Sequence, residues 1–262
     1  MPYYTFTPAP ALRPYIEMYW LMTEFWGQPK RITLTPDGSM TLMLNLGEAI
    51  HSRHFGLTQN EGIYLIGTMS RPDEQVLHGA IRLLGIQFRP GAFTHFYQYE
   101  PLNQVANQVR EFEKKLFPDV KKIVQDFVPY IDQFYLERLS SPRNSLLTVV
   151  KDIENLGGQV KIETLAKRHC ISERQLERRF NEQIGISPKE FINLARFRQA
   201  FVKIQMGGTP QNQHKRSLAD IAWECGYYDH AHLTNDFKRY AGSAPTELIL
   251  SDFSKTIALN FE

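Results

Sequence analysis

The sequence predicts an α+β protein. Its N-terminal part is a β-rich sandwich or barrel followed by helices, and its C-terminal part is an all-helical domain with two helix-turn-helix units joined by a linker helix. Two observations lead to this prediction. Short apolar runs alternate with turn signals up to Phe88, which is typical of β-sheet structure. The residue pattern at 162–192 is repeated at 218–249, with apolar positions at helical spacing in both copies.

The first half of the chain contains several short runs rich in β-branched and aromatic residues. These runs span 15–26, 40–46, 63–68 and 82–88, with turn signals at 27–29, 36–38, 47 and 71–73. Several strands at this spacing favour a sandwich or a small barrel. The aromatic residues Tyr19, Trp20, Phe25 and Trp26 could line an apolar pocket or pack in a core, and core packing is the preferred interpretation.

The pattern becomes helical after Pro90. Helical segments are expected at 93–97 and at 105–139, the second with breaks at Pro118 and Pro129. The segment 140–144 is the expected domain boundary, followed by a helix at 145–156 that ends at Gly157 and Gly158. We therefore expect a β-rich domain with C-terminal helices at 1–140 and a helical domain with two helix-turn-helix units at 145–250.

The two C-terminal copies align by hand. Leu165 and Ala166 match Ile221 and Ala222 at an offset of 56, whereas Leu176 matches Leu233 at an offset of 57. The second copy therefore has one additional residue, which we expect within the turn at 226–229 because insertions collect in turns. Two unrelated helical hairpins remain the alternative explanation.

Each copy carries signals for the start of its second helix. Ser172 is a good N-cap, and Gln175 three residues later can complete a capping box. Asp229 takes the same position in the second copy, after Gly226, which can adopt the left-handed conformation of a tight turn. Cys170 stands at the corresponding turn position of the first copy. Each copy therefore predicts a helix, a tight turn and a second helix.

The polar face of each second helix provides candidates for reading bases. Arginine can bind guanine, asparagine adenine and glutamate cytosine in the major groove, and alanine can contact a thymine methyl group. The base-reading candidates are Arg174, Glu177, Arg178, His230, Ala231, Thr234 and Asn235, and the phosphate candidates are Lys167, Asn181, Lys215, Arg216, Lys238 and Arg239. A solvated helix face would also explain any one of these residues.

A helix is expected between the two copies, from Pro188 to about Gln205. Its length of about 27 Å is close to one turn of B-DNA, about 34 Å. Such a connector could hold two recognition helices in successive segments of the major groove.

Charge supports nucleic-acid binding only when it is read locally. The whole chain carries a net charge of +2. Residues 161–216 contain 12 basic and 5 acidic residues, a difference of +7, whereas acids outnumber bases from 217 to 262. A basic excess suits a phosphate-facing surface. We expect the first unit to supply most of the electrostatic attraction and the second to depend on uncharged contacts.

These residues resemble the AraC/XylS-type DNA-binding domain. The first half of that domain is similar to LAKRHCISERQLERRF at 165–180, GISPKEF at 185–191 and ARFRQA at 195–200. The second half resembles IAWECGYYDHAHLTNDFKRY at 221–240 and GSAPTE at 242–247. The resemblance covers about the last 100 residues. It implies a bacterial transcription regulator that acts on double-stranded promoter DNA and RNA polymerase, with its two units reading adjacent major-groove segments.

Three features depart from the family pattern. Tyr227 replaces the usual phenylalanine, the segment ending at Leu248 lacks an arginine that often closes the pattern, and the join at 207–217 is longer than usual. The segments 15–20, 35–38 and 85–92 also resemble the β-rich N-terminal domain of some AraC-type regulators. That resemblance implies sensing of a small effector, formation of a homodimer, or both, without identifying an effector.

Other function classes are poorly supported. His51 and His54 have no carboxylate or cysteine cluster to complete a metal site, and no motif for catalysis or cofactor binding is present. Cys170 and Cys225 are expected to be buried thiols in a reducing compartment. An alkyl-transfer DNA-repair enzyme is an alternative, but no cysteine precedes Cys170. A DNA-binding protein whose N-terminal domain only dimerises is the other alternative.

The N-terminus has no basic region followed by an apolar run, and no segment reaches the roughly 18 apolar residues of a membrane span. We expect a soluble, cytoplasmic protein without a membrane partner or a cofactor.

Overall fold

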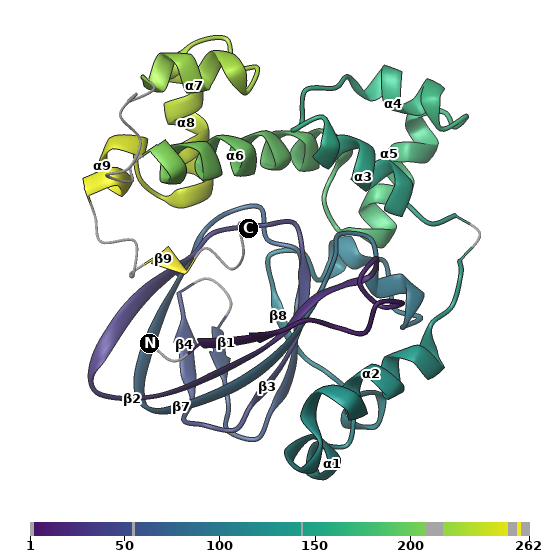
Figure 1. The fold of residues 1–262 in the computed structure, drawn as a ribbon, viewed down its shortest axis with the longest axis vertical. Coiled ribbons are helices and arrows are strands. Elements are labelled where there is room, and N and C mark those ends of the chain that lie inside the picture. The colour runs from purple at the N-terminus through teal and green to yellow at the C-terminus, as the bar shows by residue number, and fades with distance from the viewer. Residues whose placement is uncertain (1–2, 54–55, 143, 208–216, 251–255, 258–262) are drawn as a thin grey trace.

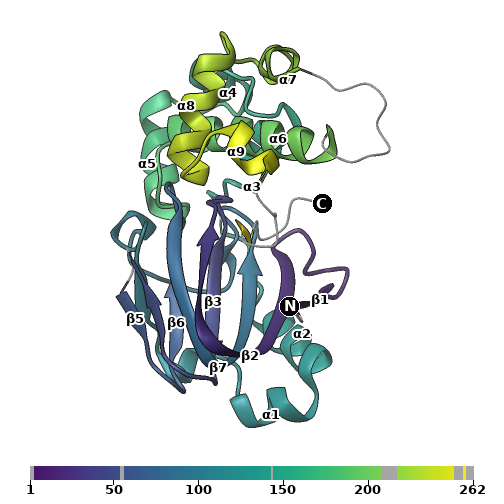
Figure 2. The same ribbon diagram turned by 90° about the vertical axis from the view of Figure 1, so that its left-hand side faces the viewer.

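The computed structural model describes residues 3–53, 56–142, 144–207, 217–250 and 256–257. Within these ranges the N-terminal part is a curled β-sheet with helices at one side, and the C-terminal part is helical (Figure 1). A view turned by 90° shows that the helical part lies across one end of the sheet (Figure 2). The predicted α+β class is confirmed, and the described strands of the N-terminal part form one curled sheet.

The described part of the sheet has nine strands, with the order β1-β2-β7-β3-β6-β8 along its main path. β4 pairs with β5 and β7, and β9 pairs with β2. The strands are β1 (Tyr3–Phe6), β2 (Ile16–Leu34), β3 (Met40–Asn45), β4 (Ile50–Ser52), β5 (Gly56–Thr58), β6 (Ile63–Ile66), β7 (Asp73–Phe88), β8 (Val109–Glu111) and β9 (Thr256–Ile257).

Two long antiparallel strands, β2 and β7, form the centre of the sheet. The expected turn at 27–29 is wrong: β2 continues through it, and the pairing register shifts between Trp26 and Lys30. Pro29 is tolerated there because an irregular position requires no ladder hydrogen bond from its nitrogen. β7 likewise begins at Asp73 rather than at Arg82, and its first residues pair with the second half of β2.

Both faces of the sheet are buried, so neighbouring residues of one strand enter different cores. Tyr19 packs with Phe88 and the helical residue Tyr135 on the face that the helices cover. Trp20 packs with Met43 and other apolar side chains in a second cluster. Tyr19 and Trp20 are therefore core residues, whereas Phe25 is 71% exposed.

The helices after the sheet differ from the predicted ones. Short 3-10 turns occupy η1 (Phe93–His95), η2 (Leu102–Gln104) and η3 (Lys114–Leu116), and the α-helices are α1 (Val120–Gln125) and α2 (Phe127–Arg138). Val109–Glu111 is a strand instead of a helix because it pairs with β6. Pro129 does not break α2, since it lies in the first turn, where backbone N–H groups have no partner within the helix.

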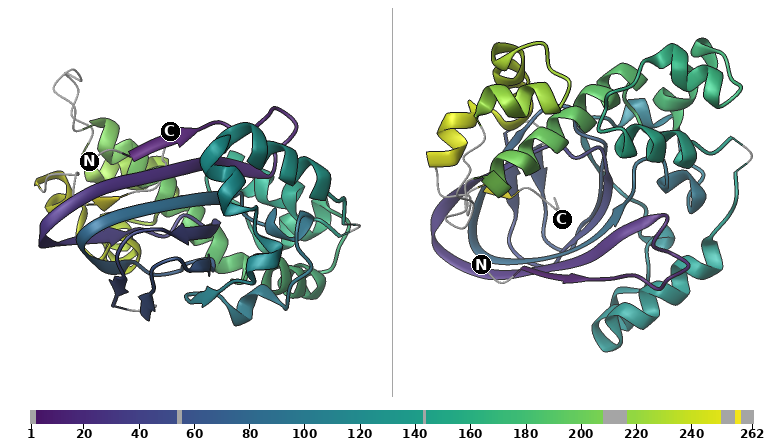
Figure 3. Two further views of the ribbon diagram at one scale, coloured as in Figure 1. Left: turned by 90° about the horizontal axis from the view of Figure 1, so that it is seen from below. Right: turned by 45° about the horizontal axis from the view of Figure 1, so that its top comes forward.

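The C-terminal part has seven described helices. They are α3 (Leu147–Asn155), α4 (Ile162–Arg168), α5 (Glu173–Gln183), α6 (Pro188–Gly207), α7 (Leu218–Glu224), α8 (His230–Ala241) and α9 (Pro245–Leu250). The long helix α6 has α4 and α5 near one end and α7 and α8 near the other (Figure 1). In the tilted view it crosses the open end of the curled sheet (Figure 3).

Side chains from α6 contact the sheet directly. Arg198 donates a hydrogen bond of 2.9 Å from Nη1 to the carbonyl oxygen of Asp37. Gly38 has a φ of +83°, and a Cβ atom there would lie 2.8 Å from the ring of Phe191, so this turn requires glycine. The two halves of the chain therefore share a packed contact. No helix in the described ranges is both long and apolar enough to cross a membrane.

Candidate nucleic-acid interface

The first helix-turn-helix unit consists of α4, a tight turn and α5. Ser172 and Gln175 form the predicted capping box: the Gln175 backbone N–H donates to Ser172 Oγ (3.2 Å), and the Ser172 N–H donates to Gln175 Oε1 (2.9 Å). Cys170 has a φ of +52°, and the next residue, Ile171, donates its N–H to the carbonyl of Ala166 at 3.0 Å. This left-handed turn orients α5 relative to α4.

The second unit repeats this geometry. Gly226 has a φ of +72°, and the following Tyr227 N–H donates to the carbonyl of Ala222 at 2.9 Å. Asp229 caps α8 by accepting a hydrogen bond of 2.7 Å from the His232 N–H. Gly226 and Asp229 therefore match Cys170 and Ser172, and the additional residue of the second copy is Tyr228. Its side chain is 91% exposed.

The second unit begins at Leu218 as predicted, but sequence reasoning did not identify the residues that cap its first helix. Ser217 and Asp220 form a second capping box, with Asp220 N–H to Ser217 Oγ at 3.1 Å and Ser217 N–H to Asp220 Oδ2 at 3.0 Å. The signal that could have revealed this cap in the sequence is a serine followed three residues later by an acidic residue.

Aromatic side chains join both units to α6. Phe197 and Phe201 of α6 contact Phe237 of α8, with ring centroids 5.0 and 6.1 Å apart. At the other end, Phe191 contacts Phe180 of α5 at 5.8 Å. The 20 residues of α6 correspond to about 30 Å. The spacing of the two units is therefore set by a packed helix rather than by a free linker.

The exposed face of α5 carries the first group of predicted base-reading residues. Arg174, Glu177 and Arg178 are all exposed. Arg178 is 66% exposed, and its only described ionic contact is a distance of 3.9 Å from Nε to Glu182 Oε1. Asn181 instead donates a hydrogen bond of 2.9 Å to the carbonyl of Glu177, so its amide is used locally.

The corresponding face of α8 is less charged. His230, Ala231 and Asn235 are exposed. Thr234 is half-buried and donates its hydroxyl to the carbonyl of His230 at 2.8 Å, which leaves its methyl group for contacts. The two recognition faces therefore differ as the sequence predicted, with arginines on α5 and small or uncharged groups on α8.

The predicted phosphate residues fall into three groups. Lys238 is exposed and has no ion pair within the described residues. Lys167 and Arg239 are held by Glu163 and Glu190, each at 2.6 Å. Lys215 and Arg216 lie outside the described residues.

Part of the basic excess of the first unit is also used internally. Arg168 pairs with Asp152 at 3.1 Å, and Arg196 donates to the carbonyl of Gly158 at 3.2 Å. The local net charge therefore overstates the number of cations that are free to face a phosphate backbone.

The cysteines only partly match the expectation of buried thiols. Cys225 is buried, and desolvation raises the pKa of its thiol. Cys170 is exposed, which corrects the expectation for this residue. Its place at the left-handed turn position puts it at the surface rather than among the core side chains. The described residues contain no group of three or more metal-ligating side chains.

Two family models match separate parts of the chain. Residues 165–250 match a helix-turn-helix domain, and residues 4–111 match a domain of unknown function, DUF6597. Among curated relatives, the HTH-type transcriptional activator RhaS of Escherichia coli is 26% identical over 113 residues, 43% of this chain and 37% of the relative. The match thus spans little more than a third of the length of that relative.

Two solved structures also align with this chain. ToxT from Vibrio cholerae is 9% identical, with a TM-score of 0.49 over 89% of this chain and 96% of ToxT. The DNA-binding domain of AdpA, solved with a target DNA, is 28% identical, with a TM-score of 0.34 over 40% of this chain and 89% of that domain.

Proposed function

We propose that this chain is an AraC-type helix-turn-helix transcription regulator, and that α5 and α8 read adjacent major-groove segments of one promoter site. The observation that carries the proposal is the attachment of two capped recognition helices near opposite ends of α6. The 20 residues of α6 give it a length of about 30 Å, which is compatible with one turn of B-DNA, about 34 Å. The aromatic contacts of α6 would keep the separation of the two units fixed.

The base-reading role falls to the exposed polar side chains of the two helices. On α5, Arg174 and Arg178 could each donate two hydrogen bonds to guanine, and Glu177 could accept from cytosine. On α8, Asn235 could pair with adenine, His230 could contact the adjacent base edge, and Ala231 could contact a thymine methyl group. The methyl group of Thr234 suits a similar apolar contact.

Phosphate binding is assigned first to Lys238, because no carboxylate among the described residues pairs with its ammonium group. Lys167 can contribute only if it leaves Glu163, and Lys215 and Arg216 extend the same role to the join before α7. Arg239 and Asn181 are less suited, since each already makes a contact within the domain.

The N-terminal residues 1–140 act in this proposal as the regulatory domain, and residues 145–250 as the DNA-binding domain. A small effector or a second copy of the chain would act on the first and alter the engagement of the second with DNA. RNA polymerase is the partner through which promoter binding would change transcription. An N-terminal domain that only dimerises is the second candidate, favoured if no small molecule shifts the melting temperature.

The proposal is tested with the full chain and duplexes selected from a random pool. Arg178→Ala should cost about 1–3 kcal/mol on the selected site and relax base preference at one position. Arg53 of the sheet is the matched control, since it is 67% exposed and pairs with Glu74. Equal losses on selected and random DNA for Arg178→Ala would reject its base-reading role, and unchanged binding would reject the α5 interface.

A further inference from the structure

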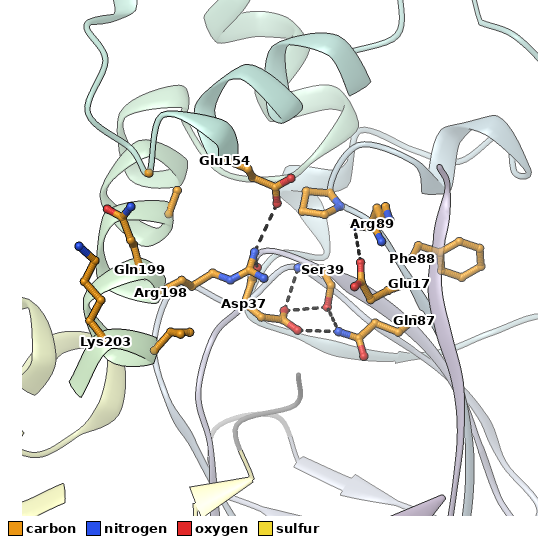
Figure 4. A pocket seen from close by; sticks show the side chains of 14 residues that line it. Glu17, Asp37, Ser39, Gln87, Phe88, Arg89, Glu154, Arg198, Gln199 and Lys203 are labelled. Atoms are coloured by element: carbon orange, nitrogen blue, oxygen red, sulfur yellow. Dashed lines mark hydrogen bonds and ion pairs between the residues drawn. The ribbon is translucent and has the colours of Figure 1, made fainter. Parts of the chain in front are cut away.

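A cavity of about 450 Å³ lies between the sheet and the helices α3 and α6 (Figure 4). Asp37, Gln87 and Arg89 line it from the sheet side, and Glu154, Arg198 and Gln199 line it from the helices. Ligand pockets in proteins commonly range from about 300 to 1,000 Å³. The cavity is therefore large enough for a small molecule that touches both halves of the chain.

The cations around the cavity are already matched by acids. Arg89 pairs with Glu17 at 2.7 Å, Arg198 with Glu154 at 3.4 Å, and Lys203 with Glu224 at 2.6 Å. An anionic ligand would have to compete with these carboxylates.

Unlike Glu17 and Glu154, Asp37 pairs with no cation among the described residues. Its carboxylate accepts hydrogen bonds only from neutral groups: the backbone N–H and hydroxyl of Ser39, at 2.8 and 2.6 Å, and the amide of Gln87, at 2.7 Å. Arg198 is directed to the backbone carbonyl of Asp37 instead. Asp37 is 8% exposed and has no ion pair in the described part of the chain. A buried carboxylate without a cation is energetically unfavourable.

Two further acceptors on the helical side of the cavity are poorly satisfied. Within the described residues, the Glu154 carboxylate has one hydrogen-bonding contact, of 3.4 Å with Arg198, and burial raises the pKa of Glu154. The side-chain oxygen of Gln199 is buried and accepts no hydrogen bond from the part of the chain that the structure describes. Asp37, Glu154 and Gln199 together favour an occupant that brings positive charge and hydrogen-bond donors.

The remaining lining shows what kind of cation would fit. No three metal-ligating side chains converge in the described residues, which disfavours a metal ion at this place. Pro90, Ala195 and Val202 supply apolar lining beside the carboxylates. This combination suits an ammonium or guanidinium group carried on a short hydrocarbon body.

We propose that this cavity is a binding site for a small organic amine or guanidine, with Asp37 and Glu154 as its counter-ions. The occupant would bridge the sheet and α6, the helix to which both recognition units are attached. Its effect on DNA rests on the proposed function above, whereas its binding does not. A ligand that strengthens the contact between α6 and the sheet favours the arrangement of the units seen here.

The test uses the full chain without DNA and straight-chain alkylamines of four to eight carbons as probes. Alkyl carboxylates and alcohols of the same lengths are the chemical controls. Calorimetric titration should detect binding of the amines and at least tenfold weaker binding of the carboxylates and alcohols. Glu154→Gln should weaken amine binding at least tenfold, and Glu74→Gln, which changes a carboxylate elsewhere on the sheet, should not.

Val202→Phe is the second variant, because it fills the cavity without changing its charges, and it should also abolish amine binding. The proposal is overturned if amines and carboxylates bind equally, if no amine binds, or if both cavity variants bind amines like the unmodified chain. DNA binding is measured separately by fluorescence anisotropy. Amine binding by a chain that does not bind DNA would refute the proposed function alone, and the reverse result would refute the cavity alone.

Discussion

Thr68 donates a hydrogen bond of 2.6 Å from its side-chain hydroxyl to the backbone carbonyl oxygen of Ile184. The two residues are 116 positions apart, and both are buried. Ile184 is the C-cap of α5, and Thr68 follows strand β6. The sheet therefore contacts the C-terminal end of α5 directly, through a group that no helix hydrogen bond satisfies.

Replacing Thr68 with valine should remove this hydrogen bond while keeping the size and shape of the side chain. Thr68→Val leaves the Ile184 carbonyl without its buried donor, which should lower the free energy of unfolding by about 1–3 kcal/mol. Urea unfolding measures this change. Thr58→Val is the matched control, because the buried hydroxyl of Thr58 has no hydrogen-bond partner among the described residues. Equal losses for the two variants would show that the bond to Ile184 contributes nothing.

His95 makes stability depend on pH at the predicted domain boundary. Its ring nitrogens lie 2.8 Å from the carbonyl of Ser140 and 2.8 Å from the hydroxyl of Ser145. Nδ1 must carry the proton, since a carbonyl only accepts, and Nε2 then accepts from Ser145. Burial lowers the pKa of His95 below its ordinary value of 6.5. The unfolded chain therefore takes up this proton at a higher pH than the folded chain.

The contribution of His95 to stability should be complete above pH 6.5 and decline as the pH falls through 6.5 towards the lower pKa of the folded state. Unfolding curves at several pH values between 7.5 and 5.5, about one unit on either side of the histidine pKa, measure it. His95→Gln offers both a donor and an acceptor but does not titrate, so its loss of stability over this range should be smaller. The same pH dependence in both proteins would assign the effect to the other histidines.

Opposite substitutions at the equivalent turn positions of the two helix-turn-helix units should have opposite effects on stability. Gly226→Ala places a Cβ in the left-handed conformation and 2.9 Å from the side chain of Gln159. It should cost about 1–2 kcal/mol. Cys170→Gly relieves the strain at the equivalent position, and the greater freedom of the unfolded chain offsets part of that gain. We expect a net stabilisation of about 0.5 kcal/mol.

Thermal unfolding of Gly226→Ala and Cys170→Gly, with Cys170→Ala as the variant that keeps the Cβ, tests this pair. Cys170→Ala should match the unmodified protein. A loss of stability in Cys170→Gly as large as that in Gly226→Ala would show that the two turns are not equivalent.

The helix-turn-helix units were predictable because their signals are local. Ser172 and Asp229 lie within three residues of the N–H groups that they cap. The errors arose where distant residues decide the structure. Val109–Glu111 is a strand because it pairs with β6. The sequence at 27–29 resembles a turn, but β7 keeps the chain extended on both sides of it.

The same distinction applies to the candidate site. The residue types on the exposed faces of α5 and α8 follow from helical spacing, so Arg178 and Asn235 could be proposed as base-reading candidates from the sequence. Their availability depends on tertiary contacts. Arg239 pairs with Glu190, which is 49 positions away in the sequence, and no local sequence pattern predicts that pair. The cavity between the sheet and α6 could not be predicted from the sequence either, since Asp37 and Glu154 belong to separate halves of the chain.

Lys238 and Arg239 are neighbours on α8, and the structure gives them different roles. Lys238 has no described ion pair, so Lys238→Gln should weaken binding to all DNA sequences and lower the salt slope by about one unit. Arg239 Nη2 lies 2.6 Å from Glu190 Oε2, and Glu190 also accepts a hydrogen bond from the Tyr240 hydroxyl at 3.0 Å. Arg239→Gln should therefore cost up to about 1 kcal/mol of stability and change the salt slope little.

Fluorescence anisotropy at several salt concentrations, together with urea unfolding, separates these effects. Glu190→Gln is the control for the pair: it should reproduce the stability loss of Arg239→Gln while the lysine remains in place. If Arg239→Gln lowers the salt slope as much as Lys238→Gln does, Arg239 leaves Glu190 to bind phosphate when DNA is present. In that case its pairing with α6 is a property of the free protein, and the second unit holds the DNA backbone with two cations instead of one.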